Sequence, residues 1–476
     1  MKIAFSNQNG ISAERLAQMC DGTVHNNQCG EILVRGLCTD SREADANTAF
    51  VAMKGERVDG HDYIAAAVQN GCRCVICERV ALESDVAFIV VENSEQSLLN
   101  MAKCHRASLS LPCVAVTGSV GKTTAKEMIS EVLATSKKVY RSKGNYNSVI
   151  GMPLSVMEIG TDADVAVLEL GMSARGEIER MSTAAAPQIA VITNIGTSHM
   201  EMLGSRANIC RAKIEILTGL CDGGTLILNG DEPLLRGVGG KRYQTLYASL
   251  EDRNADLFAD RICVDADCTT FDVVYRGSVY PDMKLNLAGR HNVYAALYAF
   301  GVGMLMGVSP EHIREGLLHF SADGMRQNRY SLGEITVIED CYNASPESMI
   351  AAIDVLHAIV KQKNGRAVAV LGDMLELGPE SPDLHKKVGA YVREKQITTL
   401  LTVGTGGLSI ADGARRAGMA REQIVSIIDR DDTEKIGAAL IDLIQKGDTV
   451  LFKASRSVRL ERVISYLREH LSNIKE

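Results

Sequence analysis

The feature that most constrains this chain is a glycine-containing loop between an apolar run and an amphipathic segment. The loop reads TGSVGKTT, and the apolar run before it is LPCVAV. The segment AKEMISEVLATS after it carries apolar residues at helical spacing, which predicts a helix. A strand, a glycine turn and a helix in this order surround one anion with backbone amides. The pattern therefore predicts a phosphate-binding loop on a parallel α/β sheet.

Eight consecutive residues form this predicted loop: Thr117, Gly118, Ser119, Val120, Gly121, Lys122, Thr123 and Thr124. We expect Lys122 to reach the β- and γ-phosphates of a nucleotide, and Thr123 or Thr124 to offer a hydroxyl to Mg²⁺. The alternative is a chance glycine turn before a helix, which does not account for the lysine and the hydroxyls in this order. The loop also departs from the general pattern, because Val116 stands where the first glycine belongs.

Further apolar runs bounded by polar turns indicate the domain organisation. ADVAVLELG and QIAVITNIG follow the loop, and EITVIEDC, RAVAVLGDM, TLLTVGTG and DTVLFKAS lie later in the chain. Strands that alternate with helices in this way predict parallel sheets, with ligands at the carboxyl ends of the strands. A chain of 476 residues is also too long for one core. We predict an α/β fold of three domains: a small N-terminal domain (1–105), a central phosphate-loop domain (106–323) and a C-terminal Rossmann-like domain (324–476).

Composition excludes several classes of protein. The net charge of −8 argues against a nucleic-acid binder, which would carry a basic stripe. The start MKIAFSNQNG has no signal-peptide core, and no apolar run reaches the roughly 18 residues of a membrane span, so we expect a cytoplasmic protein. The 13 scattered cysteines argue against a disulfide framework. Cys72, Cys74 and Cys77 have no second C-x-x-C pair, which favours buried thiols over a zinc site.

Two polar residues follow neighbouring predicted strands. Glu169 ends the run VAVLE, and His199 follows the next strand in TNIGTSHMEMLGS. Because a buried carboxylate needs a partner, this acid and imidazole could hold a metal ion beside the phosphates. Taken alone, His199 is more often a polar loop residue. By its spacing alone, Lys213 in CRAKIEILTGL looks like a solvated helix residue.

The form T-G-S-x-G-K-T-T resembles the phosphate loop of the Mur ligases and of the related folylpolyglutamate synthases. The resemblance implies that ATP is the nucleotide and that Thr123, Glu169 and His199 bind magnesium, which we expect as two ions. It also implies that Lys213 is carbamylated, since the family carbamylates a lysine in this A-K-x-x-[IL] setting. Such a carbamate turns a cation into an anion, which changes the local electrostatics. The expected catalytic residues are Lys122, Glu169, His199 and Lys213.

Four more segments match family motifs that contact ATP. KGNYNSVIGMP, which contains Asn145 and Asn147, resembles an asparagine-rich loop beside the γ-phosphate. LAGRHNVYAALYAF resembles the G-x-H-N-x-x-N-A stretch that meets adenine, although Ala295 replaces its second asparagine. DGMRQNRY carries an arginine that matches one at the domain junction, and DCYNASP resembles D-x-Y-N-A-x-P. The resemblance thus implies ATP contacts from Asn145, Asn292, Arg326, Asp340, Tyr342 and Asn343.

The outer domains carry motifs that imply the other two substrates. TDSR and the downstream GERVDGHDYI resemble the uridine-diphosphate-binding segment of Mur ligases that accept longer peptide precursors. GDMLELG resembles a signature of the ligases that add D-alanyl-D-alanine, KASR resembles the family's K-G-S-R, and the D-N-P-R of ligases adding diaminopimelate is absent. The implied nucleotide contacts are Ser41, Arg42, Asp59, Gly60 and His61. The implied residues on the dipeptide side are Asp373, Met374, Glu376, Lys453, Ser455 and Arg456.

The resemblance implies an ATP-dependent ligase of peptidoglycan precursor synthesis. It would activate the terminal carboxylate of UDP-N-acetylmuramoyl-tripeptide as an acyl phosphate and join it to D-alanyl-D-alanine. Alternatives within the class are a Mur ligase that adds another amino acid and an enzyme like the folylpolyglutamate synthases. A different class would be a regulator that hydrolyses ATP to switch conformation. We expect a monomer, and the sequence leaves open whether the third precursor residue is lysine or diaminopimelate.

Overall fold

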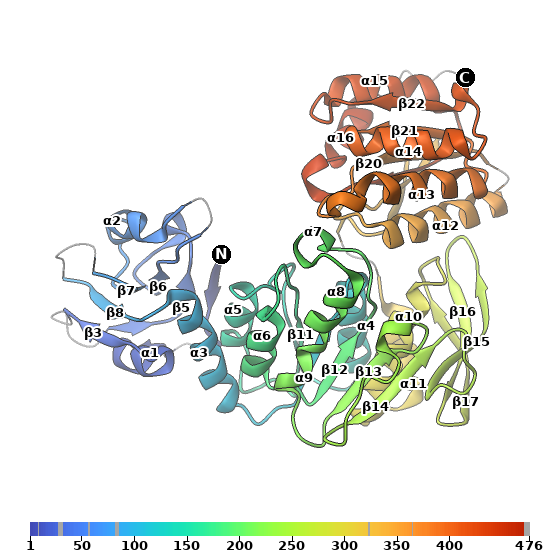
Figure 1. Cartoon of the computed structure of the whole chain (residues 1–476). Coiled ribbons are helices and arrows are strands. Elements are labelled where there is room, and N and C mark those ends of the chain that lie inside the picture. Colours follow the sequence, from blue (N-terminus) through green and yellow to red (C-terminus); the bar gives the residue numbers. More distant parts are fainter. Residues whose placement is uncertain are drawn as a thin grey trace.

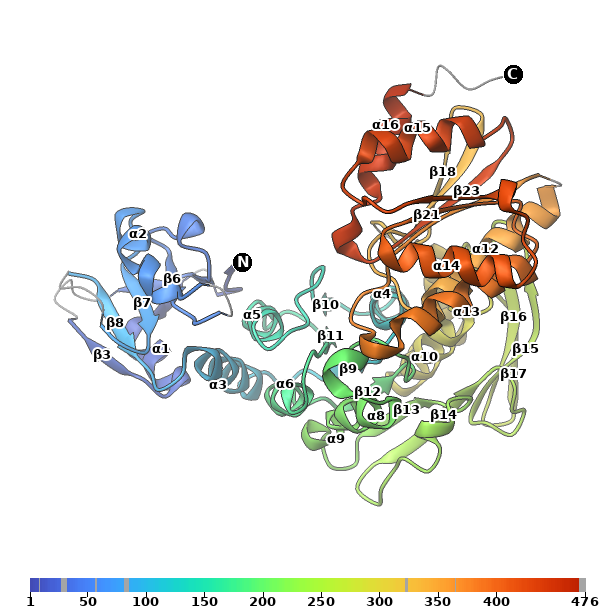
Figure 2. The same ribbon diagram turned by 45° about the horizontal axis from the view of Figure 1, so that its top comes forward.

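In the computed structural model, each of the three domains is built around one large sheet, and a small two-stranded sheet completes the N-terminal domain. The structure describes residues 1–7, 9–26, 32–55, 58–80, 85–321, 324–363 and 365–470. Figures 1 and 2 show the N-terminal domain to one side of the central domain and the C-terminal domain above the central one. The predicted α/β fold with three domains is confirmed. The domain boundaries stay predictions, and residue 323 lies outside the described residues.

The N-terminal sheet has a parallel centre and one antiparallel strand at each edge. Its order is β1 (Lys2–Ala4), β5 (Gly36–Cys38), β6 (Thr48–Val51), β7 (Cys74–Cys77), β8 (Ala87–Val90) and β3 (Thr23–His25). The other elements are β2 (Ile11–Ser12), β4 (Leu33–Val34), α1 (Ala13–Cys20), α2 (Ile64–Gln69), η1 (Ser41–Glu43) and η2 (Gly60–Tyr63). Cys72, Cys74 and Cys77 are buried free thiols at β7, as the spacing predicted.

Helix α3 (Ser94–Ala107) connects the N-terminal and central domains and packs against α1 and against helices of the central domain. Asn93 caps its start by accepting a hydrogen bond from the Gln96 amide. Near its end the buried Arg106 donates to the backbone oxygens of Ala185 and Leu111. Because a buried guanidinium needs such acceptors, Arg106 fixes the end of α3 to the central domain.

The central sheet has nine strands, and the first seven of them in spatial order are parallel to one another. Its order is β10 (Val139–Arg141), β11 (Val165–Glu169), β9 (Cys113–Thr117), β12 (Ile189–Ile192), β13 (Thr225–Asn229), β14 (Gln244–Ser249), β15 (Leu257–Val264), β16 (Thr269–Tyr275) and β17 (Ser278–Leu285). Strands β15, β16 and β17 pair antiparallel, and the sequence did not predict this extension. Part of β15 and most of β17 are exposed or half-buried, and β16 is mostly buried but carries Thr269, Thr270 and Asp272. These strands therefore lack the continuous apolar runs that mark buried parallel strands.

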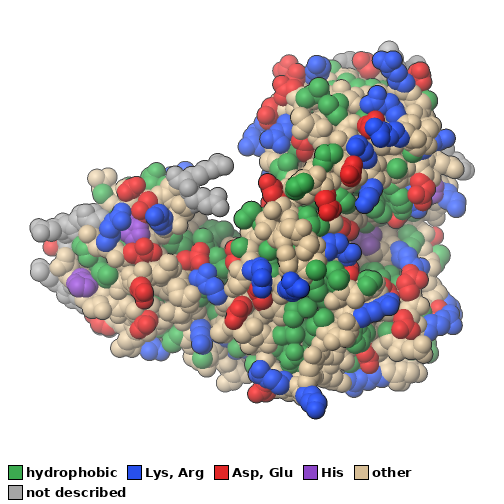
Figure 3. Space-filling view, viewed as in Figure 1, with side chains coloured by type: hydrophobic (Ala, Val, Ile, Leu, Met, Phe, Trp, Pro, Cys, Tyr) green, Lys and Arg blue, Asp and Glu red, His purple; other side chains and the backbone are tan. Residues whose placement is uncertain are grey.

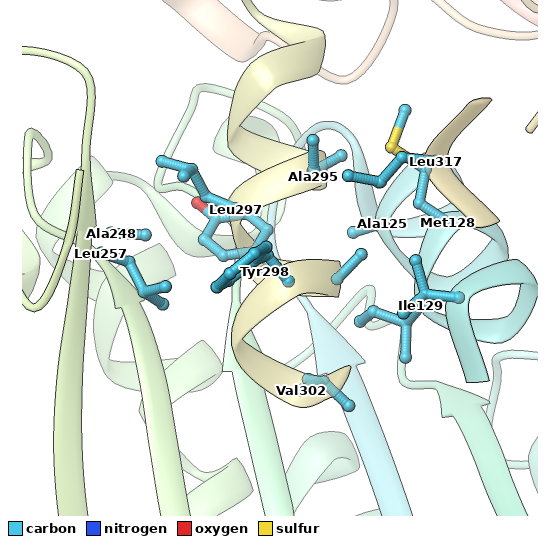
Figure 4. Close-up of a cluster of buried hydrophobic side chains, with 14 of the residues drawn as sticks. Ala125, Met128, Ile129, Ala248, Leu257, Ala295, Leu297, Tyr298, Val302 and Leu317 are labelled. Atoms are coloured by element: carbon cyan, nitrogen blue, oxygen red, sulfur yellow. The ribbon is translucent and has the colours of Figure 1, made fainter. Parts of the chain in front are cut away.

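Helices cover both faces of the parallel part. They are α4 (Lys122–Ala134), α5 (Gly151–Met157), α6 (Glu177–Ala185), α7 (Met200–Leu203), α8 (Arg206–Ile214), α9 (Ile216–Gly219), α10 (Asn292–Leu305) and α11 (Pro310–His319), with the turn η3 (Pro233–Leu235). Side chains alternate along β9, so Val114 and Val116 pack in one core and Cys113 and Ala115 in the other. Figure 4 shows the first core, where Tyr298 and other residues of α10 lie between the sheet and α4.

The C-terminal sheet has five parallel strands and one antiparallel edge strand. Its order is β18 (Asn328–Leu332), β19 (Ile335–Glu339), β23 (Thr449–Lys453), β20 (Ala367–Gly372), β21 (Thr399–Val403) and β22 (Ile424–Ile427). Its helices are α12 (Pro346–Lys363), α13 (Ser381–Glu394), α14 (Thr405–Arg416), α15 (Thr433–Leu443) and α16 (Glu461–His470), with the turns η4 (Gly378–Glu380), η5 (Arg421–Gln423) and η6 (Arg456–Val458). The four strands predicted for this domain are thus β19, β20, β21 and β23.

The space between the domains is open on the face shown in Figure 3. A broad hollow separates the N-terminal domain from the C-terminal domain above the central domain. Across the whole described part of the chain, no helix is long and apolar enough to cross a membrane.

Candidate active site

The phosphate loop joins β9 to α4 as the sequence predicted. Gly118 has a φ of +148° and Gly121 a φ of +79°, backbone conformations that favour glycine. A Cβ on Gly118 would lie 1.8 Å from the hydroxyl oxygen of Thr193, so this position also has no room for a side chain. The amides of Lys122, Thr123 and Thr124 open the helix and have no intrahelical acceptor. The loop therefore presents several N–H groups at the start of one helix, which suits an anion.

Two side chains of the loop fit a bound phosphate. The Lys122 ammonium donates to the backbone oxygens of Gly118 and Ser119, at 2.9 and 3.3 Å. Burial lowers the pKa of Lys122, the carboxylate of Glu169 opposes this shift and Arg326 adds to it. The Ser119 hydroxyl is buried and has no hydrogen-bond partner among the described residues. A phosphate oxygen would satisfy both groups.

Glu169 lies at the carboxyl end of β11, beside the loop, and is 2% exposed. Its two carboxylate oxygens accept hydrogen bonds from the Thr123 hydroxyl at 2.8 Å and the Asn147 amide at 2.7 Å. The structure therefore brings together two of the three predicted magnesium ligands, Thr123 and Glu169, and both offer oxygen, the donor that magnesium prefers. Asn147 approaches Glu169, whereas Asn145 is exposed.

Lys213 is buried within the central domain rather than solvated. Lys213 is 1% exposed, and none of the described hydrogen bonds or ion pairs involves its side chain. Burial lowers the pKa of Lys213 well below its ordinary value, and the charge of Lys122 lowers it further. Burial therefore favours the neutral amine more than it is favoured in an exposed lysine, and a neutral amine can react with carbon dioxide.

His199, the third predicted metal ligand, faces the C-terminal domain. Its Nδ1 lies 2.6 Å from a carboxylate oxygen of Glu376, and this hydrogen bond lowers the pKa of Glu376. The backbone oxygen of Glu376 also accepts a hydrogen bond from the Glu201 amide. Among the residues with a described placement, no group of three or more His, Cys, Asp or Glu side chains is arranged to hold a metal. The structure thus pairs a predicted metal ligand with a predicted dipeptide-side residue.

The C-terminal domain presents its predicted ATP residues at the same junction. The buried Lys453 ammonium donates to the carboxylate of Asp340 at 2.7 Å and to the backbone oxygen of Asn343 at 3.0 Å. The Arg326 guanidinium lies 4.1 Å from the centre of the Tyr342 ring. Lys453, which was predicted on the dipeptide side, therefore holds the segment predicted to contact ATP.

Asn292 starts α10 below this junction. Its amide donates to the backbone oxygen of Ala288 and to the side-chain oxygen of Gln327, at 2.9 and 3.1 Å. The neighbouring His291 lies 2.7 Å from the Gln327 amide nitrogen, and burial lowers its pKa to about 4. Ala295, which replaces a family asparagine, packs in the hydrophobic core (Figure 4).

The other predicted dipeptide-side residues lie at the carboxyl ends of β20 and β23. A carboxylate oxygen of Asp373 accepts hydrogen bonds from the amides of Gly406 and Gly407 at the start of α14. The Ser455 amide donates to the Asp373 backbone oxygen, so these two loops are joined. Met374 is 2% exposed and belongs to the hydrophobic core, and Arg456 pairs with Glu461.

The predicted nucleotide residues of the N-terminal domain form two turns. Arg42 is largely exposed and pairs with Asp40 at 2.6 Å, and this hydrogen bond lowers the pKa of Asp40. His61 is buried: Nδ1 contacts a carboxylate oxygen of Asp59 at 2.7 Å and Nε2 accepts from the Glu78 amide. His61 therefore holds its turn together.

The remaining two predicted nucleotide residues lie in the same turns. Gly60 follows Asp59, and a Cβ on Gly60 would lie 2.6 Å from the Met53 backbone nitrogen. Ser41 is buried, and its backbone oxygen accepts a hydrogen bond from the Asn70 side chain.

Sequence reasoning missed the residues that hold the phosphate loop from the side. Asn194 follows β12, and its side-chain oxygen accepts hydrogen bonds from the amides of Ser119 and Val120. A second missed contact does not involve the loop but joins two domains: Glu347, in the first turn of α12, accepts a hydrogen bond from the Thr197 hydroxyl. The signal for Asn194 was its place in TNIG, directly after the strand that pairs with β9.

Family profiles match three segments that together cover most of the chain. The segment of residues 33–110 matches a profile described as "Mur ligase family, catalytic domain". Residues 116–303 match "Mur ligase middle domain", and residues 325–456 match "Mur ligase, glutamate ligase domain".

Relatives and solved structures match the chain over nearly its whole length. The UDP-N-acetylmuramoyl-tripeptide--D-alanyl-D-alanine ligase of Bacillus subtilis (strain 168) is 36% identical over 461 residues, which cover 96% of this chain and 98% of that relative. A crystal structure of MurF from Acinetobacter baumannii has a TM-score of 0.87 at 31% identity and covers 97% of this chain and 100% of that chain. The MurF ligase from Thermotoga maritima, solved in complex with ADP, has a TM-score of 0.81 at 29% identity, with 92% and 97% covered.

Proposed function

Because the chain belongs to the Mur ligase family, we propose that it joins D-alanyl-D-alanine to UDP-N-acetylmuramoyl-tripeptide at the expense of ATP. The observation that carries this function is the grouping of Lys122, the Thr123–Glu169 pair and the buried Lys213 at one phosphate loop. The charge of Arg326, from the next domain, also acts on Lys122. The relative from Bacillus subtilis is named for this reaction.

The chemistry requires an activated acid. A carboxylate cannot acylate an amine directly, since an oxide would have to leave. We propose that a carboxylate oxygen of the tripeptide attacks the γ-phosphorus of ATP and ADP leaves, which produces an acyl phosphate. The amine of D-alanyl-D-alanine then attacks the acyl carbon and loses a proton, and inorganic phosphate leaves with the oxygen that came from the acid.

The loop and its lysine act on the first of these steps. Negative charge spreads over the phosphate oxygens during phosphoryl transfer. The Lys122 ammonium and the amides at the start of α4 are placed to neutralise it without reorganisation. Magnesium fits the oxygen donors of Thr123 and Glu169, and it would supply further charge neutralisation beside the phosphates.

The role proposed for Lys213 follows from its burial. A neutral amine attacks carbon dioxide and loses a proton, which leaves a carbamate with a negative charge. Buried charges need a partner, and Lys122 is the neighbouring cation that acts on Lys213. We propose that the carbamate supports a second magnesium ion together with His199, which would have to leave Glu376.

The substrates are proposed to divide among the three domains. The uridine nucleotide would bind the N-terminal turns at Ser41, Arg42 and 59–61, ATP the central loop, and the dipeptide the C-terminal loops at Asp373 and Ser455. The hollow between the outer domains (Figure 3) leaves room for a long precursor and for closure. Closure would exclude water, which hydrolyses an acyl phosphate. Since ATP and the precursor are cytoplasmic compounds, we place the reaction in the cytoplasm.

A coupled assay tests this function. Phosphate release should require ATP, the UDP-linked tripeptide and D-alanyl-D-alanine together, and the mass of the product should equal that of the pentapeptide precursor. Precursors that end in lysine and in diaminopimelate, and L-alanine or glutamate in place of the dipeptide, should be compared. Phosphate release with ATP alone at the full rate would indicate a switch instead, and turnover only with another amine would indicate a different ligase.

A further inference from the structure

The phosphate loop is held from the side by two residues that follow β12, and these residues have no part in the chemistry proposed above. The Asn194 side-chain oxygen accepts hydrogen bonds from two consecutive loop amides, Ser119 at 3.1 Å and Val120 at 2.8 Å. The Asn194 backbone oxygen accepts from Ser119 as well, at 3.1 Å. Thr193 completes the contact, because its hydroxyl donates to the Val120 backbone oxygen at 2.7 Å.

These bonds divide the amides of the loop into two groups. Ser119 and Val120 already have an acceptor, so they are unavailable to a ligand. Lys122, Thr123 and Thr124 stand at the start of α4, where amides have no acceptor within the helix. The Asn194 contact thus fixes the first half of the loop and leaves the second half free to bind an anion.

A loop of this kind needs external support. Gly118 and Gly121 both have a positive φ, and glycine allows many other conformations when nothing restrains it. Restraining the loop before the ligand arrives removes an ordering cost from binding, which raises affinity. Asn194 is suited to this role because one neutral oxygen satisfies two amides without adding negative charge beside the phosphates.

We propose that Asn194 is a positioning residue that preforms the phosphate loop for the nucleotide. The proposal rests on the ATP site proposed above. It predicts that Asn194 acts on binding of the phosphate groups and does not act on the adenine or on the other substrates.

The test compares Asn194→Ala, Asn194→Asp and the control Asn286→Ala. Aspartate has the same shape and keeps the acceptor oxygen. Asn286 also bonds to the backbone of the central domain but away from the loop, since its amide nitrogen donates to the Leu318 backbone oxygen. The measurements are amide hydrogen exchange of the loop without nucleotide, the affinities for ATP and adenosine, and the KM for each substrate.

In wild-type protein and in the Asn286→Ala control, the amides of Ser119 and Val120 should exchange slowly without nucleotide. In Asn194→Ala, the Val120 amide should exchange faster, whereas the Ser119 amide keeps its bond to the backbone oxygen of residue 194. This variant should bind ATP about 10- to 100-fold more weakly because both side-chain hydrogen bonds are lost, and it should bind adenosine as wild type does. Its KM for the dipeptide should not change. Asn194→Asp should restore slow exchange and still bind ATP weakly, because it adds negative charge.

Fast exchange of both amides in wild-type protein, or ATP affinity in Asn194→Ala within twofold of wild type, would overturn the proposal. So would an equal loss of adenosine affinity, since that result would indicate a general structural role. Failure of the wild-type protein to bind ATP would instead refute the proposed function, and the exchange measurement does not depend on it.

Discussion

The substitution Gly118→Ala tests whether the phosphate loop adopts the backbone conformation and the close packing against Thr193 that the structure shows. The change adds one methyl group at a residue with a φ of +148°, and that methyl would lie 1.8 Å from the Thr193 hydroxyl oxygen and 3.0 Å from its Cβ. The loop must move, or Thr193 must turn away and give up its hydrogen bond to Val120.

The expected cost has three sources. A non-glycine residue in this region of φ costs about 1–3 kcal/mol. Forcing a methyl into a packed site costs a further 1–3 kcal/mol or so, and the lost hydrogen bond about 1 kcal/mol. We therefore expect Gly118→Ala to destabilise the central domain by about 3–7 kcal/mol, or to distort the loop and abolish ATP binding at a smaller cost in stability.

Gly121→Ala is the matched control, because it lies in the same loop and also has a positive φ. A Cβ on Gly121 meets nothing within 4 Å, so only the backbone cost applies, about 1–2 kcal/mol. Urea unfolding and ATP titration of both variants give the comparison. Thr193→Ala in the Gly118→Ala background removes the clashing oxygen and should recover part of the loss.

Equal effects of the two alanine substitutions would refute this reasoning, since the clash would then carry no cost. No recovery in the double variant would contradict the assignment of the clash to Thr193.

Three further predictions concern single side chains. Lys122→Ala should lose ligation with the fold retained, which circular dichroism and phosphate release would check; near-normal turnover would contradict the assigned role. Lys213→Arg should be inactive, whereas Lys213→Ala should recover in part with added short-chain carboxylates; full activity of the arginine variant would refute the carbamate. His291 has a pKa of about 4 in the folded protein and about 6.5 when unfolded. The unfolded chain therefore takes up a proton first, and stability should fall by about 3 kcal/mol in total as pH drops from 6.5 to 4. His291→Gln should lose less stability between pH 7 and 5 in urea unfolding; an unchanged pH dependence would contradict the partly buried, neutral imidazole.

The sequence predicted those parts of the fold that depend on local pattern. The apolar runs that became β9, β11 and β12, and four of the five parallel strands of the C-terminal domain (β19, β20, β21 and β23), are largely buried on both faces. Each therefore reads as a continuous run of apolar residues. The phosphate loop was equally predictable, because its glycines and its lysine are adjacent in the chain. The antiparallel strands β16 and β17 were not predicted, because polar residues interrupt the apolar run of β16 and most of β17 is exposed or half-buried.

Contacts between distant segments could not be predicted from spacing. Lys213 has the spacing of a solvated residue, and only the packing of α8 shows that it is buried. The pairing of His199 with Glu376 joins two domains, and local sequence carries no signal for such a contact. Lys453 was placed on the dipeptide side by its motif, yet it bonds to Asp340, because β23 lies next to β19 in the sheet.

The central claim is that an oxygen of the tripeptide carboxylate becomes part of the released phosphate. A precursor labelled with ¹⁸O in its terminal carboxylate, incubated with ATP and D-alanyl-D-alanine, tests this claim directly. Mass spectrometry of the inorganic phosphate should find one ¹⁸O atom per turnover, because the acid oxygen attacks phosphorus and leaves with it. Phosphate that carries no label, released at the rate of peptide formation, would contradict activation through an acyl phosphate.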